Sequence, residues 1–261
     1  MRLGCVAWAV QAPILDAVRA AADAGLQAFS LLEAPQERLS LAELAELDNL
    51  MASRDLVATL HTTAVGDDDS ERRGVIERRL ALAREWHERT GRLACVTFDG
   101  AYFRKDEAKI VDLETNAARL DEALGMFAPL GVRVGIENSP RFLHNAEDVD
   151  ALARLVNPRE IGWHLDLGHL NMCLRQYGID PAGFIRHLPF EIIELHVHDN
   201  DGMDDSHIPI GDGNTDFAPI VAALKARRFD GIATLENCGL QSAEEAVDVW
   251  RRCEGIFMEL W

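Results

Sequence analysis

Cysteine is scarce and unpatterned in this chain of 261 residues. No two cysteines form a Cys-x-x-Cys pair, and the five are spread over the sequence as Cys5, Cys95, Cys173, Cys238 and Cys253. An odd, scattered set provides neither a disulfide framework nor a cysteine zinc motif, and it suits a reducing compartment. We therefore expect a cytoplasmic protein.

Positive charge is also in short supply. The chain has 26 Lys and Arg against 44 Asp and Glu, which gives a formal net charge of −18. Affinity for nucleic acid or for an anionic membrane surface comes mainly from clustered cations. The composition therefore disfavours both as partners.

Long hydrophobic runs are missing. The apolar stretch near the start ends at Asp16 and lacks a cleavage region, and no window approaches 18 uninterrupted apolar residues. We expect neither a signal peptide nor a membrane span. With 48% hydrophobic and 27% charged residues, the composition is that of a globular protein.

Short apolar, β-rich runs alternate with longer amphipathic ones about eight times. The predicted strands are Leu3–Trp8, Leu26–Leu32, Leu56–His61, Leu93–Phe98, Val132–Glu137, Ile161–Asp166, Ile192–His198 and Ile232–Glu236. Eight strand–helix units of roughly 33 residues each have the size of βαβ repeats. This favours an α/β fold, a closed (β/α)₈ TIM barrel, over a doubly wound sheet. No linker or composition break divides the chain, so residues 1–261 are predicted to form a single domain.

Several helices are marked by periodicity and by capping residues. An apolar face at steps of three and four is formed by Ile110, Leu113, Ala117, Leu120, Leu124 and Phe127. Asp68 with Glu71, and Ser242 with Glu245, have the spacing of a capping box, and Asp180 precedes a first-turn proline. Helix stops before a strand are predicted at Gly25, Gly131 and Gly231.

Polar side chains collect where the predicted strands end. Glu137, Asp166 and Glu236 each close a strand, and His196 and His198 lie at the end of another, as His61 does on the third. In a barrel of parallel strands these carboxyl ends meet at one mouth, where active sites are built. Three carboxylates and an imidazole suit one divalent ion such as Mn²⁺, Mg²⁺, Co²⁺ or Zn²⁺, and without a cation the carboxylates would repel one another.

These segments also carry a resemblance. IENSP, HLDLGHLN, HVHDNDG followed by DDSHIPIGDGNTDF, and TLEN resemble the signature segments of the xylose isomerase-like TIM barrel superfamily. The superfamily includes sugar-phosphate isomerases and epimerases, inosose dehydratases, ketose 3-epimerases and the endonuclease IV family (AP endonuclease family 2). The resemblance implies one metal held by Glu137, Asp166, His196 and Glu236. His196 is preferred to His198 because His196 and Asp199 satisfy the family pattern His-x-x-Asp/Glu.

The resemblance further implies an isomerase or epimerase acting on a sugar or polyol. In that chemistry a proton next to a carbonyl is abstracted through an enediolate, with Glu137 and Glu236 as the acid/base pair. An inosose-type dehydratase on the same site is the near alternative.

Residues around the mouth are candidates for substrate binding. His169 resembles the substrate-binding histidine of the family, and His61, His198, His207 and Arg141 are further candidates for substrate contact, with a surface role as the alternative for Arg141. For His207, the alternatives are a second metal shared with Asp205 or a role in pinning its loop. His198 could instead orient a metal ligand. His164 is expected to be a satisfied histidine of the barrel interior.

Two departures from the family pattern limit the reading. The endonuclease branch places a histidine at the end of the fourth strand, where this chain has Phe98 and Asp99, so a multinuclear metallohydrolase is less favoured. Free-ketose epimerases place a glutamate and an arginine at the positions of Leu143 and Gly202. The sugar contacts that those two side chains make in that branch are therefore absent from this chain. A non-catalytic sugar-binding barrel is a third alternative, disfavoured by the intact ligand set.

The chain ends in IFMELW, whose apolar side chains have two readings. Trp261 is expected to pack against the first helix of the barrel, with a homodimer contact as the alternative.

Overall fold

The computed structural model describes residues 1–63, 70–99, 102–105, 108–111 and 113–261. Within these residues, eight parallel strands close into a barrel in the order β1-β10-β9-β8-β7-β4-β3-β2. The barrel strands are β1 Arg2–Val6, β2 Ala28–Leu31, β3 Val57–Thr63, β4 Leu93–Asp99, β7 Arg133–Glu137, β8 Ile161–Asp166, β9 Glu191–Val197 and β10 Ile232–Leu235. The predicted (β/α)₈ fold is confirmed.

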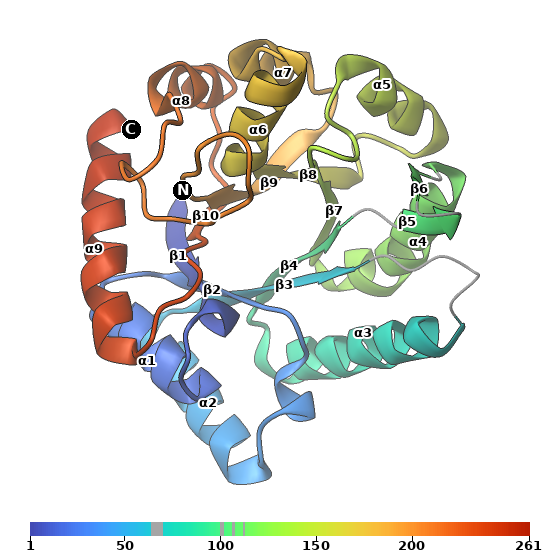
Figure 1. Ribbon diagram of the computed structural model, residues 1–261. Coiled ribbons are helices and arrows are strands. Elements are labelled where there is room, and N and C mark those ends of the chain that lie inside the picture. Colours follow the sequence, from blue (N-terminus) through green and yellow to red (C-terminus); the bar gives the residue numbers. More distant parts are fainter. Residues whose placement is uncertain (64–69, 100–101, 106–107, 112) are drawn as a thin grey trace.

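Helices surround the strands as an outer ring (Figure 1). They are α1 Ile14–Asp23, α2 Leu41–Arg54, α3 Ser70–Thr90, α4 Leu113–Phe127, α5 Ala146–Leu155, α6 Leu167–Tyr177, α7 Pro181–His187, α8 Phe217–Ala226 and α9 Ala243–Leu260. Short 3₁₀ turns lie at Ala7–Ala9, Pro35–Glu37 and Ala128–Leu130. In the described residues, no helix is both long and apolar enough to cross a membrane.

The capping signals explain where several helices begin. Ser242 accepts a hydrogen bond from the backbone N–H of Glu245, and Asp180 accepts from Ala182 and Gly183. Both helix starts are as predicted. Asp68, predicted to cap the third helix, lies outside the described residues.

Three sequence expectations about local structure are wrong. The first strand ends at Val6, because Ala7–Ala9 turn into a 3₁₀ helix. Ile110 belongs to β6 Ala108–Val111, which pairs antiparallel with β5 Tyr102–Lys105, and α4 begins only at Leu113. This hairpin lies outside the ring of barrel strands (Figure 1).

The third wrong expectation is that Gly231 ends α8. The residue in the left-handed region is Arg228 (φ +57°), and Gly231 is not among the residues with positive φ, whereas Gly25 and Gly131 are, as predicted. The N–H of Phe229 bonds to the carbonyl of Leu224, which is the closing bond of a Schellman turn. Arg228 thus occupies the position that glycine usually takes.

A register shift in β9 decides which of its side chains enter the barrel. Trp163 of β8 pairs with Ile192 while His164 pairs with Glu194, so Ile193 is an extra residue in β9. Beyond this bulge, His196 lies directly beside Asp166. Bulges re-aim side chains near active sites, and this one brings His196 into the row of Asp166.

The chain's last segment packs on the barrel's own helices. The Trp261 ring lies 5.9 Å from the ring of Phe257 and 6.0 Å from that of Phe229, measured between centroids. Phe257 is buried, while Met258 stays exposed. These ring contacts are with Phe229, after α8, and with Phe257 of α9 itself, rather than with the first helix as predicted. Homo-oligomerisation stays a prediction.

Candidate metal centre

Four of the predicted site residues come together at the carboxyl ends of neighbouring strands. Glu137 ends β7, Asp166 ends β8, His196 lies in β9, and Glu236 directly follows β10. All four are buried, with exposed fractions of 3, 0, 1 and 5% respectively. The structure therefore places three carboxylates and an imidazole in one water-poor cluster.

The three carboxylates converge on one atom. Nδ1 of His196 lies 2.9 Å from Oε2 of Glu236, 3.2 Å from Oε1 of Glu137 and 3.8 Å from Oδ2 of Asp166. Within the described part of the chain, Oε1 of Glu137, Oε2 of Glu236 and Nε2 of His196 are buried without a hydrogen-bond partner. Buried polar atoms are normally satisfied, so this set fits a site that a bound cation completes.

The donor atoms also suit a divalent ion chemically. Carboxylate oxygens with one imidazole nitrogen are accepted by Mn²⁺, Mg²⁺, Co²⁺ and Zn²⁺. Glu137, Asp166 and His196 each offer a ligand atom within 4.8 Å of the others, and Asp166, His198 and Glu236 form an overlapping group. The predicted set of Glu137, Asp166, His196 and Glu236 thus spans two candidate groups that share Asp166.

The two glutamates have different electrostatic environments. Burial raises the pKa of Glu137 to about 7. For Glu236 burial acts in the same direction, but the positive charge of His196 and the close contacts of Glu236 with His196 and His207 hold the pKa of Glu236 well below the usual range. The pKa of His196 is correspondingly raised: burial opposes its charge, and Glu236 and Glu137 outweigh that cost.

The position of Asp166 is fixed by the start of α6. Its Oδ1 accepts a hydrogen bond of 2.6 Å from the backbone N–H of His169, which makes Asp166 the N-cap of this helix. Asn138 holds the same residue from the other side, donating to its carbonyl at 3.2 Å and accepting from its N–H at 3.1 Å. Oδ2 is left facing the cluster.

A second group of polar residues lies beside the first. Nε2 of His198 is 3.2 Å from Oδ2 of Asp166, and the His198 ring stacks on that of His207 at 4.3 Å. Asp205 lies 3.1 Å from Nε2 of His169 and 3.7 Å from both His198 and His207. His198, Asp205 and His207 together form another candidate group for a metal ion.

His207 links this group to the first. Its Nε2 lies 3.4 Å from Oε2 of Glu236, and its Nδ1 lies 2.9 Å from the carbonyl of Asp205. Burial alone would lower the pKa of His207, but its close contact with Glu236 and the charges of Glu236 and Asp205 raise it to about 9. The backbone of His207 is left-handed, with φ +48°, a strained conformation of the kind that collects at functional sites.

His61 enters the cluster together with a residue that sequence reasoning missed. Nε2 of His61 lies 3.0 Å from Oδ1 of Asp99 and 3.7 Å from Oε2 of Glu137. Burial would lower the pKa of His61, but Asp99 and Glu137 raise it to about 9. The available signal for Asp99 was its place at the end of the fourth strand, two residues beyond the inward-facing Thr97.

Beneath the cluster lies a buried polar layer. Thr97 Oγ1 lies 3.1 Å from Nδ1 of His61 and 3.1 Å from Nδ1 of His164, and it donates to Glu194 at 3.3 Å. Glu194 also accepts from Thr59 at 2.7 Å. His164 is not fully satisfied as expected: within the described residues its Nε2 has no hydrogen-bond partner and lies 3.7 Å from Glu137.

Asp199 does not contact the cluster through its carboxylate. Its two oxygens accept hydrogen bonds of 2.9 to 3.1 Å from the backbone N–H groups of Asn200, Gly211, Gly213 and Thr215. The residue therefore pins the loop that carries Asp205 and His207 over the mouth. The Gly211-Asp212-Gly213 segment forms a turn before α8.

Arg141 is the one predicted substrate contact without a visible role. It is exposed, and among the described residues its guanidinium makes no hydrogen bond or ion pair. The substrate-binding role of Arg141 stays a prediction.

Comparison with known proteins identifies the family. The sequence matches the xylose isomerase-like TIM barrel family over residues 18–253. The chain therefore belongs to this family, as its segments suggested.

Individual relatives are distant. An uncharacterized protein of Methanocaldococcus jannaschii, MJ1311, is 29% identical over 144 residues, which cover 52% of this chain and only 47% of that protein. The D-allulose 3-epimerase of Methylomonas sp. in complex with D-allulose is 16% identical, with a TM-score of 0.77 over 100% of this chain and 97% of that one. The IOLI protein with a bound zinc atom is 16% identical, with a TM-score of 0.77 over 100% and 99%. The two structures share the fold.

Proposed function

We propose that this protein is a divalent-metal-dependent isomerase or epimerase of a small sugar or polyol. The observation that carries the proposal is the convergence of Glu137 and Glu236 on Nδ1 of His196, at 3.2 and 2.9 Å, in a buried cluster completed by Asp166. A D-allulose epimerase and a zinc-binding protein of the same fold support both the substrate class and the metal.

Each residue would have a distinct task. Glu137, Asp166, His196 and Glu236 would hold the ion, which when bound polarises a carbonyl and its neighbouring hydroxyl and so acidifies the C–H between them. Glu137 and Glu236, which approach His196 from β7 and from the end of β10, would flank the substrate, one removing the proton and the other returning it. His61, His169, His198 and His207 lie beside these ligands, where exchanging a present partner for a substrate oxygen would let each ring bind substrate.

Dehydration of an inosose is the near variant of this proposal. It would use the same proton abstraction, followed by loss of a hydroxyl from the neighbouring carbon. We further propose that the protein acts in the cytoplasm on a free small molecule, with homo-oligomerisation as an additional prediction.

A multinuclear metallohydrolase of the endonuclease type is the second candidate. The group of His198, Asp205 and His207 favours it, because these three could hold another ion. Asp99 in place of a histidine and the net charge of −18 weigh against it.

Solvent-isotope exchange tests the proposal. The metal-loaded protein is incubated in D₂O with a panel of ketoses and inososes, and proton NMR follows loss of the signal next to the carbonyl. Wild type should exchange at least one panel member, and Glu137→Gln and Glu236→Gln should each lower the rate by about 10²–10⁴-fold. Glu85→Gln, an exposed glutamate of α3, is the matched control. Cleavage of abasic-site DNA without any exchange would favour the hydrolase.

A further inference from the structure

A large cavity lies at the end of the barrel opposite the candidate metal centre. Its volume is about 730 Å³, and its lining comes from the amino-terminal ends of β1, β4, β7 and β9 and from the segment between α8 and β10. Pockets that bind small molecules typically have volumes of about 300–1,000 Å³. None of the residues assigned above to the metal or to substrate lines it.

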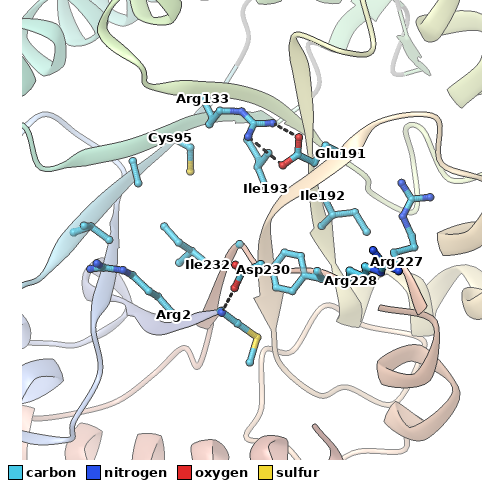
Figure 2. Close-up of a pocket in the computed structure, with 15 residues that line it drawn as sticks. Arg2, Cys95, Arg133, Glu191, Ile192, Ile193, Arg227, Arg228, Asp230 and Ile232 are labelled. Atoms are coloured by element: carbon cyan, nitrogen blue, oxygen red, sulfur yellow. Dashed lines mark hydrogen bonds and ion pairs between the residues drawn. The ribbon is translucent and has the colours of Figure 1, made fainter. Parts of the chain in front are cut away.

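The cavity is basic in an acidic protein. Its lining includes four arginines, Arg2, Arg133, Arg227 and Arg228, but only two carboxylates, Glu191 and Asp230. Figure 2 shows the arginines distributed around the rim, with Arg2 on one side and Arg227 and Arg228 on the other. An anion repelled by the net charge of −18 elsewhere would meet an opposite local field here.

Three of the four guanidinium groups already have partners. Arg133 pairs with Glu191 through two contacts of 2.9 and 3.1 Å (Figure 2). Arg2 bonds to Asp55, and Arg227 donates to three backbone carbonyls at 2.7 to 3.0 Å. The guanidinium of Arg228 makes no hydrogen bond or ion pair with any residue that the structure describes, so its charge is available to a ligand.

The backbone of Arg228 is the independent observation. This residue ends α8 in the left-handed region, φ +57°, where a side chain costs conformational energy and glycine is the usual occupant. Despite this cost, the position is occupied by an arginine that lines the cavity. Strain at a single residue is characteristic of sites where the side chain is used.

Most of the remaining lining is apolar, apart from the Met1 ammonium, which pairs with Asp230, and the Cys95 thiol. Ile192, Ile193, Phe229, Ile232 and Val57 provide a surface for hydrocarbon beside the charged rim. A bare inorganic ion would leave this surface in water, whereas an organic anion would cover it and gain the free energy of apolar burial.

We propose that this cavity is a second ligand site, which binds a small organic anion whose charged group contacts Arg228 and whose apolar body lies on Ile192, Ile193 and Phe229. The site is independent of the proposed catalytic function, since the two lie at opposite ends of the barrel.

Calorimetric titration of the metal-loaded protein with three probes tests the proposal. Benzoate carries both a carboxylate and an apolar ring, acetate only the carboxylate, and benzyl alcohol only the ring. We expect benzoate to bind saturably at one molecule per chain, and acetate and benzyl alcohol each at least about tenfold more weakly, because hydrogen bonds to charged groups and ring burial contribute at this level.

The Arg228→Gly variant tests whether benzoate binds in this cavity. Glycine suits the left-handed position, so this variant should melt about 2–4 °C higher than wild type, which shows that it is folded, while its affinity for benzoate falls at least about tenfold. Arg159→Gly removes an exposed guanidinium just before β8, at the same end of the barrel but outside the cavity lining, and should bind benzoate like wild type.

Each other outcome overturns the proposal. Unchanged affinity in Arg228→Gly would place benzoate elsewhere, including at the metal. An equal loss in both variants would indicate general electrostatic attraction, and no saturable binding in wild type would leave the cavity without a ligand of this class.

Discussion

The imidazole ring of His198 packs against Gly168 so closely that a Cβ atom on Gly168 would overlap the ring. The same ring contacts Oδ2 of Asp166 at 3.2 Å, so the absence of a side chain at Gly168 fixes the distance between His198 and a proposed metal ligand. The start of α6 thus sets both the N-cap carboxylate of Asp166 and the place of the histidine beside it.

Gly168→Ala should displace His198 without unfolding the barrel. We expect a loss of stability of about 1–3 kcal/mol from overpacking and at least a tenfold loss of exchange activity, because His198 and Asp166 can no longer keep their contact. Thermal unfolding and the deuterium-exchange rate measure the two effects. Gly125→Ala, in an open position of α4, is the matched control and should raise stability slightly at full activity. Full activity in Gly168→Ala would show that the place of His198 is unimportant.

Cys238 reports on the charge of the metal centre. It is the exposed cysteine, the other four being buried, but its thiol is partly desolvated, and this desolvation together with the charges of Glu236 and Asp205 raises its pKa to about 11. Alkylation requires the thiolate, so at pH 8 the metal-free protein should react with iodoacetamide about a hundredfold more slowly than a cysteine of ordinary pKa, and the rate should rise about tenfold per pH unit up to pH 11.

Metal binding should then accelerate this reaction. A cation held by Glu236 offsets the negative charge that raises the pKa of Cys238, and a pKa lower by about one unit gives about a tenfold faster reaction at pH 8. Mass spectrometry of the Cys238 peptide follows the rate with and without ion. An unchanged rate on loading would argue that the ion binds away from Glu236.

Asp205→Ala separates one-metal from two-metal chemistry. Asp205 contacts His169, His198 and His207, but none of the four proposed ligands of the first ion. We expect the variant to keep its ion and to show about a tenfold higher KM with a smaller change in kcat, since it loses the group that positions substrate-binding histidines. Asp204→Ala, its exposed neighbour, should behave like wild type. Loss of one ion per chain in Asp205→Ala would favour the hydrolase.

The barrel and the carboxylates at its strand ends could be predicted from the sequence, because apolar strand segments alternate regularly with amphipathic helical ones. Glu137, Asp166 and Glu236 each close an apolar run, and the parallel barrel brings such ends together whatever the loops do. The same reasoning missed Asp99 because the predicted strand ended one residue too early, at Phe98, whereas β4 extends to Asp99.

Other features depend on tertiary structure that the sequence does not display. The bulge at Ile193 sets Glu194 opposite His164, and a one-residue register shift leaves no mark in a run of apolar residues. Arg228 at the end of α8 contradicts the usual glycine rule, so Gly231 was predicted instead. Ile110 continued a helical period by coincidence although it lies in a strand.

The number of metal ions bound per chain is the most direct test of whether this cluster is a metal centre. Protein purified without chelator and dialysed against excess Mn²⁺ or Zn²⁺ is analysed for bound metal, together with Asp166→Asn and the control Asp148→Asn, an acidic residue of α5 outside the cluster. We expect one ion per chain in wild type and in the control, and no ion in Asp166→Asn. No bound ion in wild type, or an ion that Asp166→Asn keeps, would contradict the proposed centre of Glu137, Asp166, His196 and Glu236.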